Sequence, residues 1–105
     1  MSAAGEGTVK ITVQYRTKRG KTYELTSRET VLAVHIARPE GPAASGTWHV
    51  EARLGTGVGP SIADGWGTTP AEALRETGRA WASRAPVTVF DWEAVTRELR
   101  GVHAV

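Results

Sequence analysis

Three histidines are the side chains of this sequence best suited to metal binding or proton transfer. They are His35, His49 and His103. In the strand pairing derived below, His35 lies opposite His49 with Glu51 diagonal to them, on the sheet face that points away from the core. A closed zinc site takes four ligands, and the sequence has neither His-x-x-x-His nor His-Glu-x-x-His. We therefore expect two exposed histidines on a polar face and no bound metal.

The sequence lacks the signatures of nucleophilic catalysis and nucleotide binding. It has no cysteine, and no serine lies in a Gly-x-Ser-x-Gly turn. The glycine-rich stretch that begins at Gly55 is not followed by the Gly-Lys-Ser/Thr of a P-loop. An enzyme would need Ser61, Asp64 and a histidine to meet in a cleft, which no spacing predicts. We expect a protein that is not an enzyme and holds no cofactor.

Four cations within six residues form the first candidate binding surface. They are Arg16, Lys18, Arg19 and Lys21. At the tip of a hairpin they could contact phosphates and release counterions, although the net charge of the chain is only +2. No aromatic residue alternates with them, whereas single-strand binders stack bases on aromatic rings. Electrostatic nucleic-acid binding is therefore the alternative function. The other interpretation is that the hairpin is simply exposed to solvent and that its cations prevent it from pairing with strands of other chains.

Tryptophan supplies the second candidate surface. The chain has four tryptophans in 105 residues. Trp66 lies between Gly65 and Gly67 in a predicted loop, and Trp92 begins the apolar stripe of the last helix. A tryptophan in such a position either covers the core or anchors a partner. We expect Trp66 and Trp92 to bind a protein partner or a second copy of the chain.

Alternating apolar residues predict a four-stranded antiparallel meander that would position these surfaces. The strands are expected over residues 8–16, 22–27, 31–38 and 47–54. The first hairpin has a three-residue loop that ends at Gly20, because glycine takes the left-handed conformation at low cost. The cross-strand pairs of this hairpin are Tyr15–Tyr23 and Val13–Leu25, which keep the apolar residues on one face.

The remaining strand pairs follow the same matching of apolar faces. A two-residue turn at Arg28-Glu29 joins the second and third strands. The pairs then expected are Leu25–Leu32, Tyr23–Val34, Ile36–Trp48 and Val34–Val50. Residues 39–46 form a loop by composition, and Val58–Asp64 could add a short fifth edge strand within a glycine-rich connector.

Two helices are predicted to follow the strands. Thr69 can cap the first over residues 71–85, with Pro70 at its first position and Glu72 completing a Thr-x-x-Glu capping box. Asp91 can cap the second. The apolar stripes are Ala71, Leu74, Trp81, Ala82 and Ala85, then Trp92, Val95, Leu99 and Val102. Both helices can cover one sheet face, which gives an α+β fold of the order ββββαα that buries Trp48, Trp81 and Trp92.

Two stretches resemble known families. Gly67-Thr-Thr-Pro-Ala-Glu-Ala-Leu74 resembles the strand-to-helix junction of HicB-type antitoxin N-terminal domains. The likeness covers residues 48–85 and implies binding of a protein partner without catalysis, and the DNA-binding segment of that family has no counterpart here. Four antiparallel strands and a helix are also similar to Pur-type and Whirly-type single-strand-binding repeats, with Arg19-Gly20-Lys21 at the basic hairpin.

The chain length fits a single domain over residues 8–105, preceded by a disordered tail over residues 1–7. Since no secretory signal or membrane-spanning run is visible, the cytoplasm is the expected location and no membrane partner is expected. With no motif that carries chemistry, the leading expectation is a non-catalytic protein-interaction module that acts as a homodimer or an adaptor.

Overall fold

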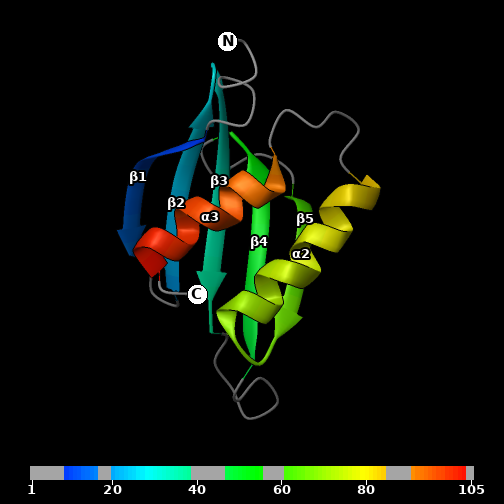
Figure 1. Cartoon of the computed structure of the whole chain (residues 1–105). Helices are drawn as coiled ribbons and strands as arrows, with labels where there is room; N and C mark the ends of the chain where they lie inside the picture. Colours follow the sequence, from blue (N-terminus) through cyan, green and yellow to red (C-terminus); the bar gives the residue numbers. More distant parts are fainter. Residues whose placement is uncertain (1–8, 17–19, 39–46, 56–60, 85–90, 104–105) are drawn as a thin grey trace.

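The computed structural model describes residues 9–16, 20–38, 47–55, 61–84 and 91–103, in which five strands and two helices follow one another. They are β1 (Lys10–Arg16), β2 (Gly20–Ser27), β3 (Thr30–Ala37), β4 (Trp48–Leu54), β5 (Ser61–Gly67), α2 (Pro70–Arg84) and α3 (Trp92–His103). The strands form one antiparallel sheet in chain order, with both helices on one face of it (Figure 1). The predicted α+β meander is confirmed. The predicted tail over residues 1–7, the loop over residues 39–46, and residues 18 and 19 lie outside the described residues.

The core lies between the sheet and the helices. Its largest fully buried side chains come from β2, β3, β4, α2 and α3, and include Tyr23, Leu25, Leu32, Val34, Ile36, Val50, Leu74, Val95 and Leu99. In Figure 1, α3 crosses over the β1–β3 side of the sheet, while α2 runs along β5 and β4. Trp81 is buried and its ring lies 5.5 Å from that of Trp92, whereas Trp48 and Trp92 are only partly buried.

The β2–β3 hairpin has the predicted register. Leu25 lies opposite Leu32, Tyr23 lies opposite Val34, and Ser27 lies opposite Thr30 across the two-residue turn. Arg28 holds a φ of 59°, the left-handed conformation that costs an L-residue free energy. The turn therefore forms although its sequence is not the preferred one for this geometry.

The predicted register of the β1–β2 hairpin is wrong. Tyr23 lies opposite Gln14 rather than Tyr15, and Leu25 lies opposite Ile11 rather than Val13. The pairing is already one residue off at the hairpin end, where Arg16 lies opposite Lys21, and an irregularity between Ile11 and Val13 adds a further residue to β1. A bulge of this kind cannot be read from alternation alone. Gly20 is not the last residue of a loop. It lies in β2 opposite Ala37, where a Cβ would come within 2.1 Å of the Ile36 carbonyl oxygen.

The predicted β3–β4 register is shifted by two residues. Ile36 lies opposite Val50, not Trp48, and Val34 lies opposite Ala52. A shift of two residues keeps every side chain on its predicted face, so the apolar pattern is the same in both registers. The consequence falls on the histidines: His35 lies opposite Glu51 and His49 lies opposite Ala37, so the predicted His35–His49 pair is wrong.

A full fifth strand replaces the short one predicted over residues 58–64. β5 spans Ser61–Gly67 and pairs with β4 along its length, placing Trp66 opposite His49 and Gly67 opposite Trp48. Trp66 therefore lies on an edge strand and not in a loop, which corrects the prediction. The glycines that suggested a loop lie instead where a helix packs closely on this strand.

Helix α2 packs directly on the backbone of β5. A Cβ on Gly65 would lie 2.4 Å from the Thr77 nitrogen and 2.7 Å from the Ala73 carbonyl oxygen. A Cβ on Gly67 would lie 2.7 Å from the Ala73 nitrogen. Thr77 is fully buried at this contact, and its hydroxyl donates to the Ala73 carbonyl oxygen at 2.7 Å. The glycines thus allow a close approach of helix and strand.

Both helices begin at the predicted caps. The Glu72 N–H donates to the Thr69 hydroxyl at 3.1 Å, and the Glu93 N–H donates to the Asp91 carboxylate at 3.0 Å. The Glu72 carboxylate makes the reciprocal hydrogen bond of the capping box with Thr68, whose N–H donates to it at 2.7 Å. This hydrogen bond holds the pKa of Glu72 below its ordinary value. The buried stripe of α2 is Ala73, Leu74, Thr77 and Trp81. The predicted stripes are partly wrong, because Ala82 and Val102 are exposed, and Ala85 lies outside the described residues.

Candidate functional site

The first candidate surface is the side of the sheet that the helices leave uncovered, which we call the open face. Alternate residues of β2–β5 point to it, because the other alternate set fills the core. Its charged, polar and aromatic members include Thr22, Glu24, Thr26, His35, His49, Glu51, Arg53, Asp64 and Trp66. Acidic and basic groups are interspersed on this face, and neither sign dominates it.

Trp66 is the most exposed large apolar side chain among the described residues, at 49 % exposure. Its ring stacks on the imidazole of His49, with the ring centroids 4.2 Å apart and the planes 26° from parallel. The Nε2 of His49 in turn lies 3.0 Å from the Asp64 carboxylate. Two neighbouring side chains therefore hold Trp66 in one orientation while half of its surface stays in water.

His35 lies one strand further into the open face. Its Nδ1 is 2.7 Å from the Thr22 hydroxyl, and Glu51 lies opposite it on β4. Burial lowers the pKa of His35 below its ordinary value. The charge of Glu51 opposes this shift, while His49 and Arg53 add to it. His35 therefore favours its neutral form at neutral pH.

Both histidines of the open face, and its carboxylates Glu51 and Asp64, already have protein partners. His35 is bonded to Thr22, His49 to Asp64, and the Glu51 carboxylate accepts from Arg53 at 2.9 Å. Among the described residues, no three His, Asp or Glu side chains are arranged to hold a metal ion. Asp64 and His49 do meet, but Ser61 makes no hydrogen bond to either of them in the described part of the chain.

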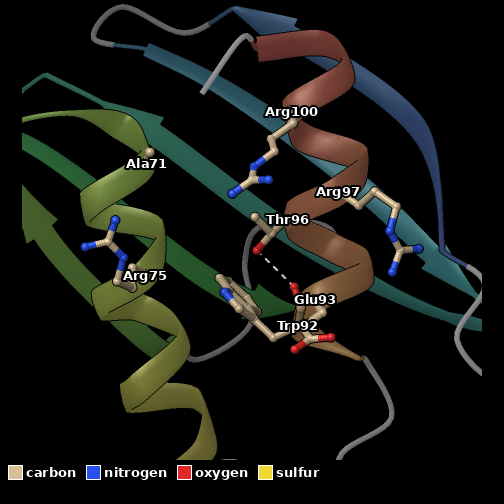
Figure 2. A pocket seen from close by; sticks show the side chains of 7 residues that line it. All are labelled: Ala71, Arg75, Trp92, Glu93, Thr96, Arg97 and Arg100. Carbon is tan, nitrogen blue, oxygen red and sulfur yellow. Dashed lines mark hydrogen bonds between the residues drawn. The ribbon is translucent and has the colours of Figure 1, made fainter.

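The second candidate surface is an open pocket of about 450 Å³ between α2 and α3, which we call the helix groove (Figure 2). Its lining residues are Ala71, Arg75, Trp92, Glu93, Thr96, Arg97 and Arg100. Three of them are arginines and one is a glutamate, so the groove is cationic. In Figure 2, Arg100 extends from α3 toward α2, and the indole of Trp92 lies between the two helices.

Trp92 joins the two helices at this groove. Its Nε1 donates to the Leu74 carbonyl oxygen at 3.2 Å, and its ring lies against Trp81. A Cβ on Gly78 would come within 2.7 Å of the Trp92 ring, so glycine at this position makes room for the indole. The structure thus places Trp92 against the core with one part facing the groove, and its predicted partner contact stays a prediction.

The basic hairpin is described only at its base. Arg16 and Lys21 lie directly opposite each other at the ends of β1 and β2, and Arg16 is exposed. Lys18 and Arg19 lie outside the described residues. The hairpin is remote in sequence from the helix groove, and neither Arg16 nor Lys21 lines that groove.

Comparisons with known protein families, with curated proteins and with solved structures find no match to this chain. The fold and the two surfaces therefore define a class by architecture alone: a two-layer α+β protein with one uncovered sheet face. None of the helices in the described residues is long and apolar enough to cross a bilayer.

Sequence reasoning found Trp66 but missed its setting and the helix groove. The contact of His49 with Asp64 follows from the pairing of β4 with β5, which requires a strand that the glycines concealed. Arg97 and Arg100 are three residues apart, a spacing that places them on one side of a helix. That signal could have been read, but only the crossing of α2 and α3 brings Arg75 to the same groove.

Proposed function

We propose that this protein is a non-catalytic interaction module that binds a second copy of itself through β5 and Trp66. The observation that carries the proposal is the half-exposed Trp66, stacked on His49 and thereby held by Asp64. A rigid tryptophan loses little conformational entropy on binding, and tryptophan is enriched among residues that dominate binding energy.

The two edges of the sheet differ in a way that favours β5 as the contact. Natural proteins protect edge strands with lysines, bulges and prolines. β1 carries Lys10, Arg16 and an irregularity near its start. β5 contains no lysine, arginine or proline, and after an irregularity at its start it continues regularly from Ala63 to Gly67. Its outer edge, which pairs with no other strand of the described residues, can therefore pair with a strand of another copy.

A second copy suits the charges that surround Trp66. The contact of two copies across a twofold axis uses the same patch twice, so the patch must complement itself. Near β5 the open face carries Asp64 and Glu51 as well as His49 and Arg53. A patch with both signs can pair with its own copy, whereas a strongly acidic or basic partner would meet like charges there.

The test is the oligomeric state of the full chain, measured by light scattering over a concentration series. We expect a dimer that dissociates on dilution, and we expect Trp66→Lys to weaken it by roughly 30-fold or more, the effect of losing a contact worth about 2 kcal/mol. Lysine at this position also introduces a charge that protects an edge strand. A chain that is monomeric at all concentrations would overturn the proposal.

Val102→Lys is the matched control. Val102 is 41 % exposed and lies on α3, on the other side of the molecule from the open face. The same substitution there should leave the dimer unchanged. Equal weakening by both substitutions would mean that added charge, and not the loss of Trp66, separates the copies, and would contradict the assignment of the contact to β5.

The alternative proposal is nucleic-acid binding by the basic hairpin, and one observation favours it. Arg16 and Lys21 lie directly opposite each other, and like charges in that position repel unless an anion lies between them. On this proposal, affinity for a labelled oligonucleotide falls steeply with salt and is lost when Arg16, Lys18, Arg19 and Lys21 are all changed to glutamine. An affinity that does not change with salt would exclude it.

A further inference from the structure

The helix groove has the size and lining of a small-molecule site. Its volume of about 450 Å³ lies within the range of roughly 300–1,000 Å³ common for ligand pockets. Two helices form its walls, and secondary-structure elements hold site residues more accurately than loops do. The groove is separate from β5 and the open face, so what it binds does not depend on the function proposed above.

The lining of the groove has a net positive charge, which favours an anionic ligand. Arg75, Arg97 and Arg100 have no ion pair with any carboxylate of the described residues. Two other arginines in the described part of the chain do: Arg53 pairs with Glu51, and Arg79 pairs with Glu76. Guanidinium groups bind phosphate and carboxylate oxygens in pairs of hydrogen bonds. Glu93 is the one carboxylate of the lining and the charge of Arg75 also acts on Glu72, so the three arginines leave an excess of positive charge around the pocket.

Trp92 adds an aromatic surface between these cations. Its Nε1 is bonded to the Leu74 carbonyl oxygen, and Gly78 and Trp81 support the ring, so its orientation is fixed. Flat rings stack on such a surface, as nucleobases do on exposed aromatic side chains. The Glu93 carboxylate, also in the lining, can accept hydrogen bonds from amino groups of a ligand.

We propose that the helix groove binds a small ligand in which an aromatic ring is joined to phosphate, the chemistry of a mononucleotide. The ring stacks on Trp92, and the phosphates lie among Arg75, Arg97 and Arg100. Either feature alone would leave part of the lining unused, since an inorganic anion does not engage the indole and a neutral ring does not engage the arginines.

The test follows the four indole N–H signals by NMR while ADP, inorganic pyrophosphate or adenosine is added to the full chain. We expect ADP to bind at least 10-fold more tightly than pyrophosphate or adenosine and to shift the signal of Trp92, which a Trp92→Phe variant identifies. Equal affinity for ADP and pyrophosphate would overturn the aromatic part of the proposal. No binding of any of the three would overturn all of it.

Two sets of substitutions with equal loss of charge make the assignment specific. Changing Arg75, Arg97 and Arg100 to glutamine should weaken ADP binding at least 10-fold. Changing Arg28, Arg79 and Arg84, which are exposed and lie outside the groove, should weaken it less than 2-fold. Equal weakening by both sets would mean that ADP responds to overall charge, and the groove would not be its site.

Discussion

At the scale of single residues, the glycines of β5 define how closely the two layers approach. Gly65 and Gly67 lie under α2, where backbone atoms of Ala73 and Thr77 occupy the space that a side chain would need. In sequence, a run of glycines indicates a turn or a mobile connector, because conformational freedom is the commoner use of the residue. Here the glycines serve steric purposes, and this is why the fifth strand and the surroundings of Trp66 could not be predicted in full.

Gly65→Ala should therefore destabilise the protein by about 3 kcal/mol, at the upper end of the cost of overpacking a core. The added methyl group would meet the Thr77 nitrogen at 2.4 Å, and backbone atoms cannot move aside as a flexible side chain can. Chemical denaturation monitored by tryptophan fluorescence measures the change. A loss below 1 kcal/mol would mean that α2 does not pack on β5 at this distance.

Gly101→Ala is the control for this substitution. Gly101 lies in α3, and a Cβ there would meet nothing within 4 Å. Because alanine favours a helix over glycine, the variant should be more stable by about 0.5–1 kcal/mol. The two substitutions add the same atom, so opposite signs would isolate the steric effect.

At the scale of elements, the features set by local sequence were predicted and the features set by distant contacts were not. The caps at Thr69 and Asp91 were correct because their hydrogen bonds span two or three residues. The β2–β3 register was correct because a two-residue turn leaves one way to pair. The other two registers failed: the loops that set them are longer, β1 has a bulge, and a shift of two residues preserves the apolar faces.

The same difference between local and distant contacts explains which parts of the two candidate surfaces were predicted. Trp66 was found because tryptophan flanked by glycine is unusual in itself, but its stacking on His49 depends on the β4–β5 register. The helix groove depends on the angle at which α3 crosses α2, which no local pattern specifies.

The β2–β3 turn provides a prediction at this scale. Arg28 holds a φ of 59°, which glycine adopts without the steric cost that a Cβ brings. Since glycine also makes the unfolded chain more flexible, Arg28→Gly should stabilise the protein by a net amount of about 0.5–1 kcal/mol. Thermal unfolding measures this, with Glu29→Gly as the control, because Glu29 has no positive φ and should lose stability.

At the scale of the whole molecule, one sheet face is closed by helices and the other carries ionisable groups at partly buried positions. His35 lies among Glu51, His49 and Arg53 on that open face, and its pKa in the folded protein is lower than in the unfolded chain. Below the unfolded value of about 6.5, the unfolded chain therefore binds more protons than the folded protein does. This contribution to stability is complete above that pH and is lost as the pH falls.

We therefore expect the free energy of unfolding to decrease between pH 7 and pH 5, and to decrease less in a His35→Gln variant. Glutamine can still form a hydrogen bond with the Thr22 hydroxyl but does not titrate. Denaturation curves at several pH values check this. An identical slope in the native chain and His35→Gln would show that His35 does not contribute.

The position of α3 has a consequence for how the chain reaches its folded state. α3 is the last described element, yet it lies over β1–β3, the first strands to emerge during synthesis (Figure 1). Proteins are made from the N-terminus, so the core side chains of β2 and β3 are made before Val95 and Leu99, which belong to the same core cluster. A chain that terminates before residue 91 would lack α3, leave apolar side chains of the sheet exposed to solvent and tend to aggregate. Chaperones that bind nascent chains would therefore matter most before α3 is synthesised.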